Sequence, residues 1–344
     1  EINPKSEWDS ISINYTSGTT GNPKGVVYHF RGAYLNAIGN TVEWDMCSKP
    51  IYLWTLPMFH CNGWCFPWTI AAKGGTNVCI RKVTAKNIYD SISKYKVDHF
   101  CGAPTVLGLL INAVDKEKKK FLHTCKVMTA AAPPPAAVLQ SMELMGFQVT
   151  HVYGLTEVYG PCVVCVWNPD WDILPPNEKA ALKSRQGVSY VVQEGLRVVF
   201  KNTSDSVPKD GKTIGEVLLR GNIMMKGYLK DPLETEKAFK DGWFHTGDLG
   251  VIYPNGYIQL KDRLKDIIIS GGENISSIEI ENCIFNLSEV AACAVVAMHD
   301  EKWGEVPCAF IEKKPDGIIN EAEVLEYCRN NLAHYKIPKK IIFK

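Results

Sequence analysis

The sequence predicts an α/β protein with a parallel-sheet core, a small antiparallel β subdomain and a small α/β unit at the C-terminal end. Short apolar strands alternate with helical segments between residues 77 and 152, and this alternation favours a parallel sheet with helices packed on it. Between residues 196 and 220, apolar and polar side chains alternate with a period of two, which is typical of antiparallel strands. The last part, about 80 residues from Lys265, repeats strands and helices on a smaller scale.

The elements of the core follow from the spacing of apolar residues. In residues 31–44, Tyr34, Leu35, Ile38 and Val42 fall on one side of a helix. We expect further helices at 85–95, 106–115 and 136–144, and strands at 51–56, 77–80, 99–102, 126–129 and 148–152. Parallel sheets bind ligands at the carboxyl ends of their strands. The loops after the last three strands are therefore the first candidates for a site.

The elements beyond the core are expected to be shorter. Ser276 and Glu279 form an S-x-x-E capping box, which predicts that a helix begins there. We expect a second helix at 321–332, and strands at 196–200, 215–220, 267–269, 292–298 and 308–312.

Residues 15–25 (YTSGTTGNPKG) combine Ser and Thr hydroxyls, three glycines and one lysine directly after a predicted strand. Glycines let backbone amides approach an anion, hydroxyls donate to phosphate oxygens, and lysine adds a positive charge. Because Gly25 follows Lys24, the spacing is not that of a P-loop GTPase or ATPase. The alternative interpretation is a flexible surface turn. We expect this loop to precede helix 31–44 directly, so that the helix N-terminus adds positive charge towards a phosphate.

The segment TSGTTGNPKG resembles the phosphate loop of the adenylate-forming superfamily, which comprises acyl-CoA synthetases, luciferases and peptide-synthetase adenylation domains. Later segments extend the resemblance over nearly all of the chain. It implies a catalytic role for Lys24, and it implies that the phosphates of ATP are bound by Thr16, Ser17, Gly18, Thr19, Thr20 and Lys24.

A second segment, YGLTE at residues 153–157, also has side chains suited to a nucleotide. Tyr153 can offer a flat face to adenine, and Gly154 lets the backbone approach. Thr156 can donate to the α-phosphate, while Glu157 can ligate Mg²⁺, which prefers oxygen. Alone, the segment predicts only a turn and a helix start with Thr156 as N-cap. Together with the first loop it resembles the superfamily's adenine and magnesium motif, which implies catalytic roles for Thr156 and Glu157.

A carboxylate beside a glycine, Asp248, is suited to accept both hydroxyls of a ribose, although an aspartate in a β-turn is common without any ligand. The resemblance makes Asp248 the ribose-binding residue and places Arg263 near the ribose and phosphate. It also adds to the nucleotide site the loop residues Ala131, Ala132 and Pro133.

Residues 58–64 carry few charges and much aromatic surface. Such a segment suits the wall of a pocket for an apolar acid, and plain core packing is an equally good interpretation for its individual aromatic residues. The resemblance makes His60 a gate beside the acyl pocket, with a role in catalysis. The implied pocket residues are His60, Cys61, Asn62, Gly102 and Gly154.

The charged run at 261–266 could be a solvated linker, but the resemblance makes it a boundary between domains. It divides the chain into part of a large AMP-binding domain (1–262), a hinge (263–265) with Lys265 as the pivot, and an incomplete lid (266–344). Residues that would meet the pantetheine arm of coenzyme A are Ser270, Gly271 and Gly272.

Both ends of the chain are expected to be cut. The resemblance implies a large N-terminal lobe before Glu1 and a short tail after Lys344. The superfamily's catalytic lysine would lie in that tail, so no other lysine near the C-terminal end is given its role. We therefore expect little adenylation from this chain alone.

Composition excludes several classes of function. The formal net charge of +1 gives no electrostatic case for nucleic acid or an anionic membrane. The sequence shows neither a membrane span nor a signal peptide. We expect an intracellular location, in the cytoplasm or the peroxisome, and a peroxisomal signal would lie at the true C-terminus. Twelve cysteines lie mostly in apolar runs, as buried free thiols do in a reducing compartment. Cys162 and Cys165 form a CxxC, but a zinc site would need a second pair. Nothing in the sequence indicates an oligomeric state.

Taken together, the sequence predicts an ATP-dependent acid–CoA ligase that uses Mg²⁺, ATP and coenzyme A on a short- or medium-chain fatty acid or an aromatic acid. Two alternatives stay open. The acyl group could pass to another acceptor, such as a carrier-protein thiol or a luciferase-like oxidation, or the chain could bind nucleotide without catalysis.

Overall fold

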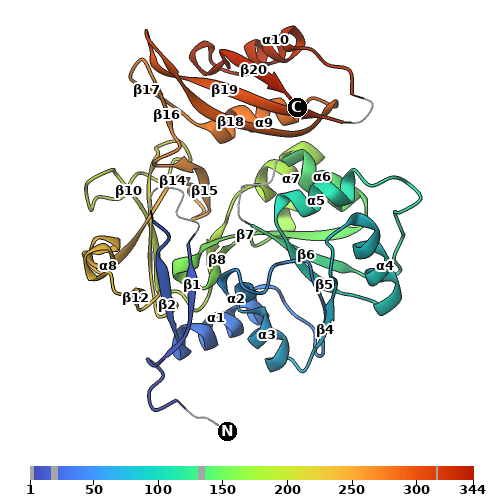
Figure 1. Ribbon diagram of the computed structural model, residues 1–344, viewed down its shortest axis with the longest axis vertical. Coiled ribbons are helices and arrows are strands. Elements are labelled where there is room, and N and C mark those ends of the chain that lie inside the picture. The colour runs from blue at the N-terminus through green and yellow to red at the C-terminus, as the bar shows by residue number, and fades with distance from the viewer. Residues whose placement is uncertain (1–3, 17–21, 131–135, 315–316) are drawn as a thin grey trace.

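The computed structural model describes residues 4–16, 22–130, 136–314 and 317–344. Its largest sheet has seven strands in the order β4-β3-β5-β6-β7-β8-β9 (Figure 1). The first five run parallel, and the last two are antiparallel to their neighbours. The predicted parallel core is confirmed, and its strands are β3 (Ile51–Trp54), β4 (Thr76–Cys79), β5 (His99–Gly102), β6 (Cys125–Thr129) and β7 (Phe147–Leu155). The two antiparallel strands are β8 (Gly160–Val164) and β9 (Val188–Ser189).

Helices cover both faces of this sheet. Alternate residues of a strand point to opposite faces, so one strand can pack against helices on both sides. Leu53 and Phe100 pack with α4 (Ala85–Tyr95), α5 (Pro104–Ile111) and α6 (Ala136–Leu144). Tyr52 and Cys101 point to the other face and pack with Phe66 of α3 (Phe66–Ala72). There α3 lies against α1 (Phe30–Glu43).

Two antiparallel sheets flank the core. One has the order β10-β11-β14-β13, with β15 paired to β14, and the other has the order β1-β2-β12. The antiparallel subdomain predicted from period-two alternation is therefore present. Its strands are β10 (Gly195–Val199), β11 (Gly215–Arg220), β13 (Phe239–Lys240), β14 (Trp243–Ile252) and β15 (Ile258–Arg263), and those of the smaller sheet are β1 (Ser10–Tyr15), β2 (Gly25–His29) and β12 (Gly227–Tyr228).

The C-terminal part forms a separate layer above β14 and β15 in Figure 1. Its sheet has the order β17-β16-β19-β18, with β20 parallel to β19. As predicted, the Ser276 hydroxyl caps the following helix by accepting from the Glu279 amide, while the Glu279 carboxylate pairs with Lys336 instead of returning to the cap. The elements are β16 (Ile268–Ser270), β17 (Glu273–Ile275), α9 (Ser277–Phe285), β18 (Val290–Asp300), β19 (Gly304–Lys313), α10 (Glu321–Asn331) and β20 (Lys340–Phe343).

The phosphate-loop segment does not lead directly into a helix, so that expectation was wrong. It joins β1 to β2, which pair antiparallel with Tyr15 opposite Gly25. Val26 and Tyr28 of β2 are fully buried, because the short apolar run after the loop pairs as a strand before α1 begins. Five strand residues separate the loop from α1, roughly 16 Å at 3.3 Å per residue. The N-terminus of α1 therefore cannot act on a phosphate in the loop.

Two further boundaries differ from the prediction. The helix expected at 106–115 is α5, which ends at Ile111 before the charged run 115–120. Strand β7 continues through Tyr153 and Gly154 to Leu155, because this segment pairs with β8. A 3₁₀ turn (Thr156–Val158) follows, and its N-cap is Leu155, so Thr156 is not the cap. The remaining short elements are α2 (Cys61–Trp64), α7 (Pro176–Lys183), α8 (Pro232–Ala238) and the 3₁₀ turns Pro169–Ile173 and His334–Lys336.

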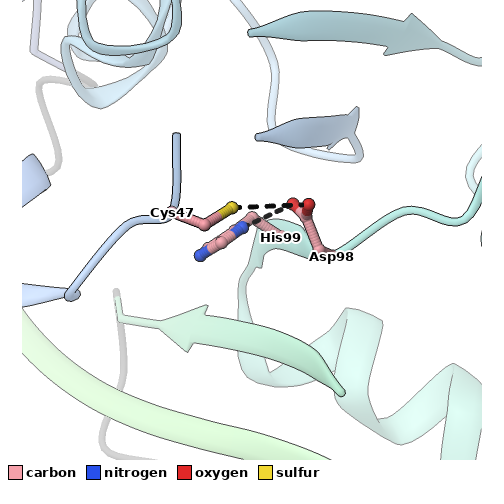
Figure 2. Close-up of side chains that lie close together, drawn as sticks. All are labelled: Cys47, Asp98 and His99. Atoms are coloured by element: carbon pink, nitrogen blue, oxygen red, sulfur yellow. Dashed lines mark hydrogen bonds and ion pairs between the residues drawn. The ribbon is translucent and has the colours of Figure 1, made fainter. Parts of the chain in front are cut away.

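The cysteines are free thiols, and most are buried as predicted. Cys79 is an exception, because alternation along edge strand β4 turns Val78 inward and Cys79 to solvent. Cys47 is also exposed and lies near Asp98 and His99 (Figure 2), with its Sγ 3.7 Å from Asp98 Oδ2. Asp98 is already used structurally, because it binds His99 Nδ1 at 2.5 Å and accepts from the Ile51 amide at 2.9 Å. This cluster lies at the amino ends of β3 and β5, opposite the end at which ligands bind.

Candidate active site

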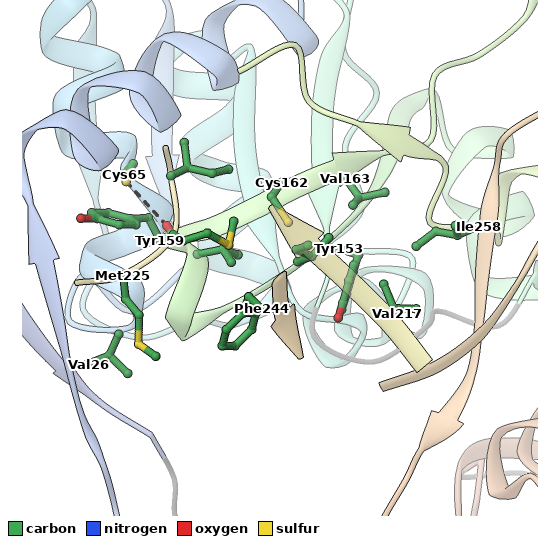
Figure 3. Close-up of a cluster of buried hydrophobic side chains, with 14 of the residues drawn as sticks. Val26, Cys65, Tyr153, Tyr159, Cys162, Val163, Val217, Met225, Phe244 and Ile258 are labelled. Atoms are coloured by element: carbon green, nitrogen blue, oxygen red, sulfur yellow. Dashed lines mark hydrogen bonds between the residues drawn. The ribbon is translucent and has the colours of Figure 1, made fainter. Parts of the chain in front are cut away.

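The site lies on a buried core formed by β7, β8, β11 and β14. Tyr153 of β7 packs among Val163, Val217 and Phe244 in this core, and its hydroxyl points out of the group (Figure 3). The residue is 7% exposed, so little of its ring face is open to a ligand. The core thereby fixes the carboxyl end of β7, where the sequence predicts that adenine binds.

Three residues predicted to bind the nucleotide meet at this end. The Tyr153 hydroxyl donates to Asp248 Oδ2 at 2.6 Å, and Arg263 Nε lies 3.4 Å from Asp248 Oδ1. Strand pairing explains the second contact, since Asp248 of β14 lies opposite Arg263 of β15. Residues separated by as many as 110 positions in the sequence are thus brought together by three strands.

The surroundings of the buried Asp248 carboxyl have two opposing effects on its pKa. Burial raises its pKa above the ordinary value, while the Tyr153 hydroxyl and the Arg263 guanidinium oppose that rise. A ribose would bring hydroxyl donors to a carboxylate that is already desolvated and oriented, and such bonds to charged acceptors are among the stronger ones.

Lys24 and Glu157, the predicted phosphate and magnesium residues, lie on either side of Tyr228. The Tyr228 hydroxyl donates to Glu157 Oε1 at 2.9 Å, and Lys24 Nζ lies 5.0 Å from the centre of the Tyr228 ring. Lys24 also pairs with Glu234 of α8. Glu157 has a half-buried carboxylate with oxygen ligands of the kind Mg²⁺ prefers, so the residues present fit the ion.

The described ends of the phosphate loop are tied to each other. The Thr16 amide donates to the Lys24 carbonyl at 3.0 Å, and the Lys24 amide donates to Thr16 Oγ1 at 3.1 Å. These bonds hold Lys24 at the start of β2, facing the site. The predicted phosphate residues Ser17, Gly18, Thr19 and Thr20 lie outside the described residues, as do Ala131, Ala132 and Pro133.

Of the predicted acyl-pocket residues, Cys61 lies beside Thr156. Cys61 is buried, and its Sγ lies 3.7 Å from Thr156 Oγ1. The Tyr28 hydroxyl donates to the Thr156 carbonyl at 2.5 Å, which orients the 3₁₀ turn. His60 is exposed immediately before α2, and its pKa is lowered by partial desolvation. Gly102 is buried at the carboxyl end of β5.

Residues 61–65 form a left-handed turn. Cys61, Asn62, Gly63, Trp64 and Cys65 all have positive φ, between 43° and 64°. For residues other than glycine this conformation costs roughly 1–2 kcal/mol each. The surroundings impose it, since Asn62 Oδ1 accepts from both Ser12 and Asn14 of β1 at 2.6 Å. Strain of this kind is concentrated at functional sites, and this turn presents Cys61 to Thr156.

The predicted hinge and coenzyme A residues lie on the C-terminal side. Arg263 ends β15, and Lys265 is exposed two residues further on. Gly271 and Gly272, which turn β16 into β17, are exposed and have positive φ of 59° and 89°; Ser270 is half-buried beside them. The buried Asp262 carboxylate accepts from the Ser277 amide at 2.7 Å, which joins β15 directly to the N-terminus of α9.

Comparison with known families decides the membership of the chain. The AMP-binding enzyme family matches residues 1–229, and the family of AMP-binding enzyme C-terminal domains matches residues 279–344. The chain belongs to the AMP-binding enzyme family. The superfamily resemblance suggested by the two glycine-containing motifs is confirmed.

Within the AMP-binding family the chain is similar to plant acid–CoA ligases. It is 52% identical to acetate/butyrate–CoA ligase AAE7, peroxisomal, of Arabidopsis thaliana, over 99% of this chain and 61% of the relative. It is 52% identical to acetate–CoA ligase CCL3 of Humulus lupulus, with the same coverage. The peroxisomal benzoate–CoA ligase of Arabidopsis thaliana is 49% identical over 98% of the chain and 60% of its own length. The chain therefore spans about three fifths of these relatives.

Solved structures of the family share the fold. ATP-bound MatB from Rhodopseudomonas palustris is 27% identical with a TM-score of 0.86, over 99% of this chain and 65% of that one. O-succinylbenzoate CoA synthetase from Bacillus subtilis, in complex with ATP and magnesium ion, is 27% identical with a TM-score of 0.83, over 100% of this chain and 69% of its own.

Two residues beside the site were missed by sequence reasoning, namely Tyr228 and Glu234. A signal for their surroundings was present, since Asp231, Pro232 and Glu234 have the spacing of a helix start, and Asp231 does cap α8 by accepting from the Glu234 amide. The contact of Tyr228 with Glu157 had no signal, because 71 residues separate the two.

Proposed function

We propose that the protein is an ATP-dependent acid–CoA ligase that acts on a short-chain aliphatic or aromatic carboxylic acid. The proposal is carried by the convergence of Tyr153, Asp248 and Arg263, together with Glu157 and Lys24, which both contact Tyr228. These groups are those needed to hold a ribose, a metal-bound polyphosphate and a transferring phosphoryl. The relatives named as acetate, butyrate and benzoate ligases support the substrate class.

The reaction has two steps. A carboxylate oxygen attacks the α-phosphorus of ATP, an acyl-adenylate forms, and pyrophosphate leaves. The thiol of coenzyme A then attacks the acyl carbon, releases its proton, and AMP leaves. We assign Thr156 to the α-phosphate, Lys24 to phosphate charge and Asp248 to the ribose. Their contribution is orientation and charge stabilisation, and Mg²⁺ held by Glu157 would neutralise charge on the phosphates.

The same proposal gives a role to each of the other predicted residues. His60, Cys61, Asn62, Gly102 and Gly154 would line the acyl pocket beside Thr156. The hairpin turn containing Ser270, Gly271 and Gly272 would receive the pantetheine arm. Residues 266–344 would act as a lid that pivots at Lys265.

No helix in the described ranges has the length and apolar character needed to cross a membrane. We propose an intracellular location, in the cytoplasm or the peroxisome, because several relatives are named as peroxisomal. Imaging of a fluorescent fusion with free termini in turn would test this.

A substrate panel tests the function. The complete protein is incubated with ATP, Mg²⁺, coenzyme A and acetate, butyrate, 2-methylpropanoate or benzoate, while pyrophosphate and acyl-CoA are measured separately. We expect both products in equal amounts with at least one acid. Pyrophosphate without acyl-CoA would indicate another acyl acceptor, and nucleotide binding without pyrophosphate would indicate a non-catalytic protein.

A further inference from the structure

Tyr228 occupies a position between two functional groups that come from distant parts of the chain. It ends β12, which pairs antiparallel with β2, the strand that begins directly after Lys24. One end of its side chain binds Glu157 and the face of its ring is 5.0 Å from Lys24 Nζ. A single side chain thus contacts both the proposed magnesium carboxylate and the proposed phosphate lysine.

The backbone around Tyr228 is held on several sides. The Tyr228 amide donates to Thr235 Oγ1 at 2.9 Å, and the Leu229 amide donates to the Gly25 carbonyl at 2.7 Å. The Met225 amide donates to the carbonyl of Glu157 at 2.8 Å. The backbone of this segment is therefore tied to α8, to the end of the phosphate loop and to the 3₁₀ turn.

The hydrogen bond from Tyr228 to Glu157 has a defined direction. A carboxylate can only accept a hydrogen bond and a phenol is protonated at neutral pH, so the Tyr228 hydroxyl is the donor. Glu157 Oε1 accepts from the tyrosine, and the carboxylate keeps lone pairs on both oxygens that could bind an ion. A carboxylate oriented in this way loses less rotamer freedom when it binds a metal.

Glu234 supplies a charge partner for Lys24 in this structure. It lies on α8 and pairs with both Lys24 and Lys237. Its hydrogen bonds to Lys237 and Lys24 lower its pKa to about 2, so it is ionised throughout the physiological range. A bound polyphosphate would compete with this carboxylate for the same ammonium group.

We propose that Tyr228 is a positioning residue that orients Glu157 for Mg²⁺ and supports Lys24, and that Glu234 holds Lys24 until a nucleotide displaces it. This inference rests on the proposed function of the same site. Tyr228 would act through the two residues it contacts, and Glu234 would compete with the phosphates for Lys24.

The first test removes only the hydroxyl. Tyr228→Phe keeps the ring beneath Lys24, so we expect the half-saturating Mg²⁺ concentration for ATP binding to rise about 3- to 10-fold, the range for one lost hydrogen bond of about 0.7–1.4 kcal/mol. Affinity for ATP without Mg²⁺ should stay within about twofold. Tyr253→Phe is the matched control, because that hydroxyl donates to Gln259 away from the site. An unchanged Mg²⁺ titration in a folded Tyr228→Phe variant would overturn the inference.

The second test removes the competing charge. Glu234→Gln should tighten binding of ATP about 2- to 10-fold without Mg²⁺. In the parent protein Lys24 must give up its ion pair with Glu234 before it pairs with a phosphate, and in the variant it has no such pair with residue 234 to lose. The effect should disappear in the Lys24→Ala background. Glu236→Gln on the same helix is the control, since Glu236 is exposed. Equal affinity of Glu234→Gln and the parent protein would overturn this part.

A double-mutant cycle separates this inference from the proposed function. Glu157→Gln alone should raise the Mg²⁺ requirement, and Tyr228→Phe should add almost nothing to it, because contacting residues are not additive. If Glu157→Gln has no effect, the proposed metal role fails and the inference fails with it. If Glu157→Gln has its effect but Tyr228→Phe adds a further, independent shift, only the inference is overturned.

Discussion

At the scale of single residues, the proposed nucleotide site is built around one buried carboxylate. Asp248 is 4% exposed and bonded to Tyr153, with Arg263 beside it. The motif around Asp248 is only an aspartate in a glycine turn when it is taken alone. The contacts with Tyr153 and Arg263 distinguish Asp248 from an ordinary turn aspartate, because they hold its carboxylate in one orientation.

We therefore expect Asp248→Ala to weaken ATP and AMP alike, because both contain the ribose. Losing hydrogen bonds to a charged acceptor costs about 1.5–3 kcal/mol, or roughly 10- to 150-fold in affinity. Calorimetric titration of both nucleotides measures this. Asp248→Asn keeps an acceptor for Tyr153 and should lose less, and exposed Asp205→Ala is the control. Parent-like affinity in Asp248→Ala would remove this residue from the site.

At the scale of elements, the approach of β7 to β8 requires a glycine. A Cβ added to Gly154 would lie 1.7 Å from the Gly160 carbonyl oxygen, which is far inside contact distance. Both strands shape the site, since β7 carries Tyr153 and the two strands are joined by the turn that contains Glu157. The glycine is thus needed by the sheet itself, whether or not a ligand is bound.

Gly154→Ala should lower the free energy of unfolding by about 1–3 kcal/mol or more, because backbone must shift to admit the methyl group. Chemical denaturation measures this change. Gly108→Ala is the matched control: it lies inside α5, and a Cβ there meets nothing within 4 Å, so alanine should be neutral or stabilising by about 0.5–1 kcal/mol. Similar stability of the two variants would show that β7 and β8 are more adaptable than their geometry indicates.

At the scale of the whole molecule, the C-terminal layer is joined to the rest at the end of β15. Asp262, before the proposed hinge, accepts from Ser277 at the start of α9. The Ser276 hydroxyl also donates to the Lys261 carbonyl. These bonds connect the two sides of residues 263–265, so a rotation about the hinge would have to break them.

Lys265→Pro tests the hinge in the complete protein. Rotation requires a large change of φ or ψ at a few positions, and proline fixes φ near −65° and restricts Leu264 before it. We expect thioester formation to fall more than pyrophosphate release, since Lys265 is not itself among the residues proposed to bind ATP. The two half-reactions are measured separately.

Lys265→Ala is the control for that experiment, because it removes the ammonium group but leaves the backbone free to rotate. Equal loss of both half-reactions in Lys265→Pro would indicate misfolding or a chemical role. Retention of both would show that Lys265 is not the pivot.

Much of the fold was predictable, because apolar periodicity reports directly on local structure. The spacing of the core strands and helices predicted the parallel sheet, and helix 136–144 was placed at its observed bounds. Strand β2 was missed because GVVYH is too short to separate a strand from a helix start by periodicity. The assignment of Thr156 as an N-cap was wrong because pairing with β8 extends β7 to Leu155. At this position the pairing of β7 with β8, a tertiary contact, outweighed local propensity.

The sequence by itself determined the family and the identity of the proposed site residues, because glycines, hydroxyls and charges at fixed spacing carry that chemistry within short segments. Only the tertiary structure decided how these residues are held. The contact of Tyr228 with Glu157 and the pairing of Lys24 with Glu234 join positions 71 and 210 residues apart. Contacts over such separations arise from the packing of β2, β12 and α8, which no local pattern in the chain encodes.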